Sequence, residues 1–526
     1  MRQPRQGRKL DSLTRGPVAT RLRRTALAVA AGLLMVAAHD PLGWWPLAWV
    51  GLVPWITAIL PRHGERPGGA WPGFVFGLVL HLAGLHWMNR IGAGPWIALA
   101  LLQAAWFAVF GAVAGRVLPR LGPRARALAF ATGWVTFEWV RSSGPYAFPW
   151  FLLASAHTRE SALPWLQIVS LGGQWGLSFA AAYANGLLAE AFSTRRGRWL
   201  AGAAALAMGL GAAGSVLRTF VELDALSSDA RRVRIAVVQG AEDRGTDRDT
   251  ALALYSRLTR EAPRDVDLVV WPEGTVPGDP AIRVSLDALA REIGTPILAG
   301  MIESNPDGTL ANSLRLFPES TRPVAYVKRQ IVPFGEFFPA RAVLGPIFER
   351  YGVTYPDFKG GARPGVFRIG AGDDAFTVGT AICYESAFPY VARDTVRAGA
   401  DVLVFTTSDQ TFDGTVELEQ HLDLARVRAV ETGRWLVRAA STGVSAVLRP
   451  DGRTIQSGYA ERASPARLPV GRPGVLVATV DLPAIRGGWN DATRAGDGVA
   501  WWCVAGAAAA CVAAWRRRGV DQTGKP

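Results

Sequence analysis

Cysteine and charged residues are both scarce in this 526-residue sequence. It contains only 3 Cys, which excludes a scaffold held together by disulfides. Its glycines follow no three-residue period, which excludes a collagen-like chain. Charged residues make up 19%, below the roughly 25% usual in soluble domains. Hydrophobic residues make up 49%, and that much apolar surface excludes a disordered chain.

Acidic residues are nearly absent from the first 220 residues, which hold 21 Lys and Arg against 6 Asp and Glu. Residues 221–526 are close to neutral, with 36 basic and 37 acidic side chains. The net charge of +14 therefore lies in the hydrophobic half, which is not typical of a nucleic-acid-binding domain. Arginines in the loops of a hydrophobic region are typical of a polytopic membrane protein, so we expect a membrane and no nucleic acid as partner.

Hydrophobic stretches predict seven helices over 24–220 and one more near the end of the chain. Fourteen of the 20 Trp lie in the first 199 residues, as expected where indoles anchor helix ends at the membrane interface. A crossing needs about 20 residues, so two of the stretches, 24–38 and 125–142, are short. The predicted helices are 24–38, 42–60, 70–90, 94–117, 125–142, 164–192, 199–217 and 497–515.

Loop charges predict the orientation of these helices. The basic tail 1–23 should be cytoplasmic, because positive loops stay inside. Seven crossings then place the polar region outside, and the eighth returns the tail 516–526 to the inside. Residues 21–40 could instead be a cleaved signal peptide, which would leave the polar region outside as well. The loops that fit the inside position are 61–69, 118–126 and 193–198.

The polar region, residues 232–485, reads as an α/β domain of several layers. Short hydrophobic runs alternate with helical stretches at 251–262, 281–293 and 416–432. The region is long enough for a full core and contains no G-x-G-x-x-G phosphate loop. The predicted strands are 234–240, 266–273, 296–303, 313–318, 325–336, 376–385, 401–408, 435–441, 445–450 and 475–482.

One cysteine, Cys383, lies alone in this polar domain. It has no partner for a disulfide and no Cys or His neighbours for zinc. Cys503 and Cys511 fall in the last hydrophobic helix, where packing accounts for them. Cys383 lies at the end of a predicted hydrophobic strand. Two further predicted strands also end in a reactive side chain, VVWPE in Glu273 and AYVK in Lys328.

These three strand ends supply a base, a cation and a nucleophile. A carboxylate with apolar neighbours has a raised pKa and can take a thiol proton. An ammonium group favours the thiolate and stabilises a tetrahedral oxyanion. The thiolate can attack a carbonyl to give a thioester. We therefore predict Glu273, Lys328 and Cys383 as the catalytic residues of an acyl-transfer site that needs no metal or other cofactor.

The motifs around these residues resemble the nitrilase (carbon–nitrogen hydrolase) superfamily, and more narrowly its membrane-bound apolipoprotein N-acyltransferase family. The resemblance covers almost the whole chain and implies a multi-pass α-helical membrane domain with an extracytoplasmic, nitrilase-like αββα sandwich. It also implies the bacterial cytoplasmic (inner) membrane, with the α/β domain on the periplasmic side. The motifs are W-P-E, K-x-x-x-V-P-F-G-E, I-C-Y-E, FPW (148–150) and KRQIVPFGEFFP (328–339).

The resemblance implies a ping-pong acyl transfer. Cys383 would attack the sn-1 ester of a phospholipid, the acyl donor, and leave a lysophospholipid. The α-amino group of a diacylglyceryl-cysteine at a lipoprotein N-terminus would then accept the acyl chain. Glu273 would be the base, and Lys328 would stabilise the oxyanion.

Supporting roles are implied for Glu336, Tyr384 and Glu385. We expect Glu336 to keep Lys328 charged and oriented, and the backbone N–H of Tyr384 to donate to the oxyanion. The alternative for both acids is that they only satisfy backbone or Arg partners. Loop 337–361, apolar and rich in Gly and Pro, would be a membrane-facing lid over the acyl channel rather than a buried insertion.

Three segments depart from the family pattern. Residues 408–413 read SDQTFD where the family has N-D-x-W-F-G, and 438–443 read RAASTG where it has R-x-T-N-x-G. Ala241 follows Gln239-Gly240 where the family has Asn. His421 is expected to be structural, because the other residues already supply a base. The departures keep open a membrane-tethered amidase or hydrolase, in which water resolves the thioester, and a catalytically inactive scaffold or transporter.

Overall fold

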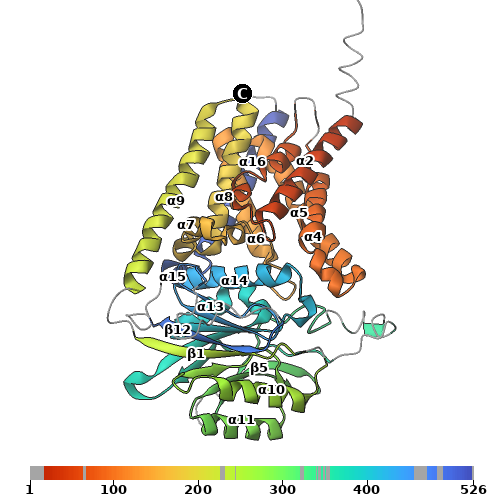
Figure 1. Cartoon of the computed structure of the whole chain (residues 1–526). Helices are drawn as coiled ribbons and strands as arrows, with labels where there is room; N and C mark the ends of the chain where they lie inside the picture. The colour runs from red at the N-terminus through yellow and green to blue at the C-terminus, as the bar shows by residue number, and fades with distance from the viewer. Residues whose placement is uncertain are drawn as a thin grey trace, which may run out of the picture.

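The chain forms a helical part stacked on an α/β part (Figure 1). The structure, a computed structural model, describes residues 17–62, 67–225, 231–242, 245–319, 325–338, 356–454, 471–482 and 490–523, together with residues 65, 341, 345, 346 and 350.

The helical part contains the long helices that the hydrophobic stretches predict. Its α-helices are α2 (Pro17–Ala38), α3 (Val53–Ile59), α4 (Ala70–Gly84), α5 (Ala93–Val117), α6 (Pro123–Arg141), α7 (Leu163–Leu166), α8 (Val169–Thr194), α9 (Gly197–Ala225), α15 (Asp491–Ala495) and α16 (Gly498–Thr523). Short 3-10 helices connect them: η1 (Trp45–Trp49), η2 (His86–Arg90), η3 (Leu118–Arg120), η4 (Ala154–His157) and η5 (Glu160–Ala162).

Three of the predicted helices are interrupted. The stretch 42–60 divides into η1 and α3, each with a proline, Pro46 and Pro54, in its first turn. Proline suits that position because its missing N–H needs no partner there, so each proline starts a new helix. The stretch 70–90 likewise becomes α4 and η2, and 164–192 becomes α7 and α8.

Three helices within the described residues are long and apolar enough to cross a membrane: Ala93–Arg120, Gly197–Glu222 and Gly498–Arg517. The charge pattern predicts eight crossings. The difference has two physical sources, because Trp45–Ile59 and Ala70–Gly84 are shorter apolar segments, while α8 buries polar side chains such as Asn185 and Glu190.

The α/β part is built on two sheets. The first has the strand order β12-β1-β2-β4-β5-β6, with β3 beside β4, and the second has the order β11-β10-β9-β8-β7. The first sheet contains β1 (Arg232–Gln239), β2 (Leu268–Val270), β3 (Val276–Pro277), β4 (Ile297–Ser304), β5 (Leu310–Phe317), β6 (Ala325–Val327) and β12 (Gly474–Asp481). The second contains β7 (Gly365–Ile369), β8 (Phe376–Ile382), β9 (Val402–Thr407), β10 (Leu436–Ala440) and β11 (Ala446–Leu448).

Both sheets are mixed. In the first sheet β1, β2 and β4 run parallel, and β12 pairs antiparallel with β1, so that Ala236 faces Val477. In the second sheet β8, β9 and β10 run parallel, with Ala381 opposite Phe405. The carboxyl ends of these parallel strands therefore meet at one edge, where open α/β sheets place their ligands.

The sheets face each other across an apolar core, with helices on both outer sides. Side chains such as Val237, Leu298, Val378 and Val404 fill the space between the sheets. α10 (Arg248–Glu261) and α11 (Pro280–Ile293) cover the first sheet, and α13 (Pro389–Arg397) and α14 (Glu417–Thr432) lie between the second sheet and the membrane helices (Figure 1). This arrangement confirms the predicted αββα sandwich.

The layer formed by α13 and α14 belongs to the same apolar core as the membrane helices. Within this junction the Gln420 amide of α14 is buried and has four partners. It accepts hydrogen bonds from the indole N–H groups of Trp87 (3.1 Å) and Trp150 (2.9 Å). It donates to the carbonyl oxygens of Asp40 (3.0 Å) and Gly84 (3.4 Å). One side chain thus fastens the α/β domain to three separate membrane-domain segments.

Replacing Gln420 with Ala should lower the melting temperature of the detergent-solubilised protein. The substitution leaves two buried indole N–H groups without acceptors, and each such group costs about 1–3 kcal/mol. Val284→Ala, at an exposed position on α11, is the matched control. A melting temperature unchanged in Gln420→Ala would contradict a fastening role.

Candidate active site

The three predicted catalytic residues follow strands of both sheets. Glu273 comes three residues after β2, Lys328 directly follows β6, and Cys383 directly follows β8 at the start of a short 3-10 helix, η7 (Cys383–Ala387). The charges of Glu273 and Lys328 both act on the Cys383 thiol, so the fold brings the three groups into one site.

Lys328 is buried, with 1% of its surface exposed, and its ammonium group lies between two carboxylates. Its Nζ is 2.7 Å from Glu336 Oε1 and 3.3 Å from Glu273 Oε1. Burial alone would lower the pKa of Lys328, but Glu336 and Glu273 outweigh it and hold the pKa well above its usual value. Lys328 is therefore a permanent positive charge inside the site.

Glu273 is held by three donors. Its Oε1 accepts from the Asn312 amide (2.7 Å) and from Lys328, and its Oε2 accepts from the backbone N–H of Ser408 (2.8 Å). The same Asn312 amide nitrogen is 3.3 Å from Glu336 Oε1. Asn312 therefore joins the two carboxylates that face Lys328. One signal in the sequence could have pointed to Asn312, namely a polar residue within the largely apolar run of β5.

Cys383 is partly buried and has a backbone φ of +53°, a left-handed conformation that costs energy for a residue with a side chain. Burial and the negative charge of Glu273 raise the pKa of the Cys383 thiol well above its usual value, although Lys328 opposes them. The group at rest is a thiol rather than a thiolate. A nucleophile in this state needs a base to take its proton, and Glu273 is the carboxylate with the largest effect on it.

The two supporting acids differ in their contacts. Glu336 contacts Lys328, whereas Glu385 is fully buried and accepts from the Tyr326 hydroxyl (2.8 Å) and from the backbone N–H groups of Arg329 (2.6 Å) and Gln330 (3.0 Å). Burial raises the pKa of Glu385, and its effect exceeds the opposite effect of the hydrogen bonds. Glu385 thus fixes the chain directly after Lys328.

Tyr384 connects the site to the helical part. Its hydroxyl donates to the carbonyl oxygen of Ala147 (2.5 Å). Its ring lies nearly parallel to that of Trp150, with 6.3 Å between the centroids, and near Phe148. The FPW segment (148–150) therefore packs against Tyr384 in the loop that carries the nucleophile Cys383.

His421 also contacts the nucleophile loop. Its Nε2 donates to the carbonyl oxygen of Cys383 (3.1 Å), and its Nδ1 lies 3.1 Å from Asp409 Oδ1. Asp409 also accepts from Arg438 at 2.7 Å. Burial would raise the pKa of Asp409, but Arg438 and His421 outweigh it and hold the pKa well below its usual value. Asp409, His421 and the nearby Glu417 are close enough to share a metal ion, yet the Arg438 guanidinium already supplies a cation to Asp409.

The three segments that depart from the family pattern lie together in space. The Ser441 hydroxyl donates to that of Ser408 (3.1 Å), and Thr442 donates to Asp413 (2.9 Å). The backbone N–H of Ala241 donates to the carbonyl oxygen of Ser441 (2.8 Å). Because Ser408 also holds Glu273, the substituted residues form one connected group beside the carboxylate.

Most of the predicted lid, 337–361, lies outside the described residues. Its described end returns to the site, where the backbone N–H of Phe358 donates to the carbonyl oxygen of Glu336 (2.7 Å) and that of Gly361 donates to Lys328 (2.8 Å). Backbone hydrogen bonds therefore attach this end of the loop to the segment that carries Lys328 and Glu336.

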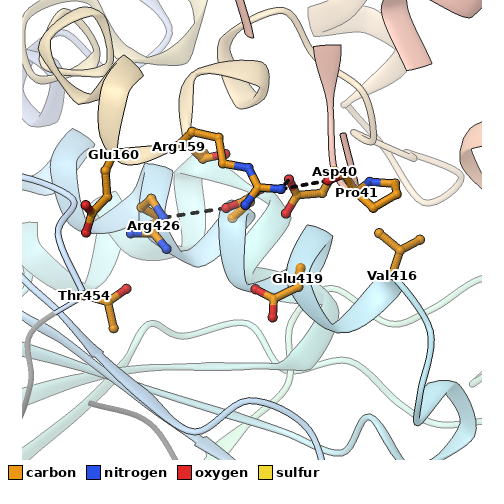
Figure 2. Close-up of a pocket in the computed structure, with 10 residues that line it drawn as sticks. Asp40, Pro41, Arg159, Glu160, Val416, Glu419, Arg426 and Thr454 are labelled. Carbon is orange, nitrogen blue, oxygen red and sulfur yellow. Dashed lines mark hydrogen bonds and ion pairs between the residues drawn. The ribbon is translucent and has the colours of Figure 1, made fainter. Parts of the chain in front are cut away.

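A cavity of about 510 Å³ lies at the junction of the two parts, where α14 meets the loops that follow α2 and η4 (Figure 2). Its lining is highly charged. Arg159 pairs with Asp40 at 2.5 Å, and Arg426 lies 3.6 Å from Asp423. Burial and the charge of Asp40 raise the pKa of Asp423 to about 7. Each pair lies within one part, Arg159–Asp40 in the helical part and Arg426–Asp423 in α14, and the two parts interact here through the charge of Asp40 on Asp423.

Two family models match the chain on either side of the junction. Residues 31–187 match the apolipoprotein N-acyltransferase N-terminal domain, and residues 234–487 match the carbon-nitrogen hydrolase family. A Gloeobacter violaceus apolipoprotein N-acyltransferase is 32% identical over 84% of this chain and 88% of the relative. The Ralstonia nicotianae enzyme of the same name is 32% identical over 90% and 92%.

The chain belongs to the apolipoprotein N-acyltransferase family. Membership in this family makes the protein an acyltransferase homologue within the nitrilase superfamily. Among solved structures, an amidase from Nesterenkonia sp. AN1 is similar over 52% of this chain and 96% of that chain, with 21% identity and a TM-score of 0.35.

Replacing Asn312 with Asp should slow the alkylation of Cys383 by iodoacetamide about tenfold or more, because a donor to two carboxylates becomes a third acid. The rate is read by mass spectrometry of the Cys383 peptide. Asn305→Asp, in a turn whose amide contacts Thr309, is the matched control. Equal alkylation rates in Asn312→Asp and the wild type would contradict the role of Asn312 in holding Glu273.

Proposed function

We propose that this protein is a phospholipid-dependent N-acyltransferase that acylates the N-terminal diacylglyceryl-cysteine of apolipoproteins through a thioester on Cys383. The contact of the buried Lys328 ammonium with the Glu273 and Glu336 carboxylates, beside a protonated thiol, is the observation that carries this proposal. Family membership supports the same substrate class.

In the first half-reaction Glu273 takes the proton from the Cys383 thiol, and sulfur attacks the sn-1 ester carbonyl of the phospholipid. A sulfur–carbon bond forms, and the negative charge on the carbonyl oxygen is stabilised by Lys328. The ester carbon–oxygen bond then breaks. The glycerol oxygen takes the proton from Glu273 and leaves as a lysophospholipid.

In the second half-reaction the α-amino group of the lipoprotein attacks the thioester. A carbon–nitrogen bond forms and the carbon–sulfur bond breaks. The amine loses its proton to Glu273, which returns it to the Cys383 sulfur. The thiol is regenerated, so the acceptor needs no further activation and no cofactor takes part.

The position of the nucleophile supports a lipid donor. Tyr384, the residue after Cys383, packs against Trp150 and bonds to Ala147 of the helical part, and Gln420 of α14 fastens the same region. The nucleophile loop therefore lies against the helical part, which favours a donor that resides in the membrane. The loop charges further support a location in the bacterial inner membrane with the site on the periplasmic side.

Incubation of the purified protein with phospholipid alone should add one acyl chain to wild type, and intact-mass spectrometry should detect it. Hydroxylamine should remove the adduct, as it does for a thioester. Cys383→Ala should give no adduct while remaining folded and membrane-inserted, and Glu273→Gln and Lys328→Met should block its formation. Full activity in Cys383→Ala would contradict the mechanism.

Addition of a diacylglyceryl-cysteine peptide should transfer the chain to the peptide amine and restore the unmodified enzyme mass. The products separate the alternatives. Free fatty acid in place of N-acylated peptide would indicate a membrane-tethered hydrolase. An enzyme without adduct or product, in conditions where the fold is intact, would indicate an inactive scaffold.

A further inference from the structure

His421 occupies an unusual position for a residue that the acyl-transfer chemistry does not require. It lies on α14 with only 2% of its surface exposed, next to Gln420, which fastens the helix to the membrane part. Its Nε2 lies 3.1 Å from the carbonyl oxygen of Cys383, the nucleophile itself. Its Nδ1 lies 3.1 Å from Asp409 Oδ1.

Both neighbours of the ring are acceptors. A backbone carbonyl oxygen can only accept a hydrogen bond, and so can a carboxylate in its ionised form. Asp409 is ionised because Arg438 donates to its other oxygen at 2.7 Å and Thr407 donates at 2.8 Å. The ring nitrogen that faces the Cys383 carbonyl oxygen, Nε2, therefore carries a proton and donates to that oxygen.

Charged and titratable groups surround the ring. The groups that face the ring are Asp409, Glu417 at 3.4 Å on the same helix, and the Cys383 loop, while Arg438 of β10 lies behind Asp409. Burial and Asp409 raise the pKa of Glu417 well above its usual value, which favours the neutral acid. Asp409, itself paired with Arg438, thus holds the His421 ring beside the nucleophile loop.

The hydrogen bond at Cys383 fixes a whole peptide plane. The peptide between Cys383 and Tyr384 is planar and trans, so its C=O and its N–H point in opposite directions. Holding the carbonyl oxygen toward His421 turns the Tyr384 N–H away from it, to the opposite side of the peptide. A hydrogen bond to the carbonyl oxygen also polarises the peptide and makes its N–H a stronger donor.

We propose that His421, oriented by Asp409, is the positioning residue for the oxyanion-donor peptide of this enzyme. It acts through the Cys383 carbonyl group and aims the Tyr384 N–H at the oxygen that becomes negative in each tetrahedral intermediate. The left-handed backbone of Cys383 needs such an external hold, because a residue with a side chain does not keep this conformation by itself. The proposal rests on the acyl-transfer function proposed above.

Two reactions of the same thiol test this inference. Acylation by a p-nitrophenyl fatty ester passes through a tetrahedral oxyanion, whereas alkylation by iodoacetamide displaces iodide at a saturated carbon and has none. His421→Leu should slow first-turnover release of p-nitrophenolate about 100-fold, the loss typical of one oxyanion donor, with KM unchanged. His421→Gln, which keeps an N–H donor without the imidazole ring, should restore part of the rate. Alkylation of Cys383 should keep the wild-type rate in both.

Matched controls separate this role from a structural one. His86→Gln, at an exposed histidine on η2, should change neither reaction. Asp409→Asn should slow acylation and leave alkylation unchanged, as His421→Leu does. It serves as the second variant if His421→Leu does not fold. A parallel fall of acylation and alkylation, or wild-type acylation in His421→Leu, would overturn the inference.

Because the p-nitrophenyl ester replaces the phospholipid, this experiment tests the role of His421 independently of the proposed phospholipid donor. A wild-type enzyme that reacts with the p-nitrophenyl ester and not with phospholipid would contradict the proposed donor and still test His421. A wild-type enzyme that reacts with neither ester would contradict both proposals.

Discussion

A buried ammonium group between two carboxylates is the constraint on which the site depends. Lys328 has almost no contact with solvent, and Glu336 and Glu273 balance its charge at 2.7 and 3.3 Å. Removing one partner of such a group leaves an uncompensated charge in the interior, which typically costs about 3–5 kcal/mol. The strand ends, the Asn312 amide and the Ser408 N–H therefore all serve to hold these charges in place.

The same constraint explains how the two halves of the chain cooperate. The cation comes from the first sheet, the thiol from the second, and the wall beside the thiol from the membrane part through Tyr384, Ala147 and Trp150. Adjacent residues of α14 connect these pieces. Gln420 bonds to the membrane segments, and His421 bonds to the carbonyl group of the nucleophile. Docking of the α/β domain and the geometry of its reactive loop are therefore linked through one helix.

The sequence predicted the architecture well where hydrophobic pattern dominates. The αββα sandwich is confirmed, and the strands β1, β4, β9 and β12 lie within one or two residues of the predicted runs. The predicted strand 325–336 was too long, because only Ala325–Val327 pairs and the chain then turns to bring Glu336 back to Lys328.

What the sequence did not reveal are contacts between distant segments. Asn312, Asp409 and Arg438 carry no distinctive spacing, and their importance arises only when β5, β9 and β10 meet beside the thiol. His421 was expected to be structural, and its contact with Cys383 joins residues 38 positions apart. The most direct test of the central constraint compares the melting temperature and acylation of Lys328→Met with those of Lys328→Met combined with Glu336→Gln. The account predicts that the double variant melts higher than the single one, because it lacks the Glu336 carboxylate that has lost its ammonium partner, and that neither variant forms a thioester. A double variant that is no more stable, or one that recovers acylation, would contradict it.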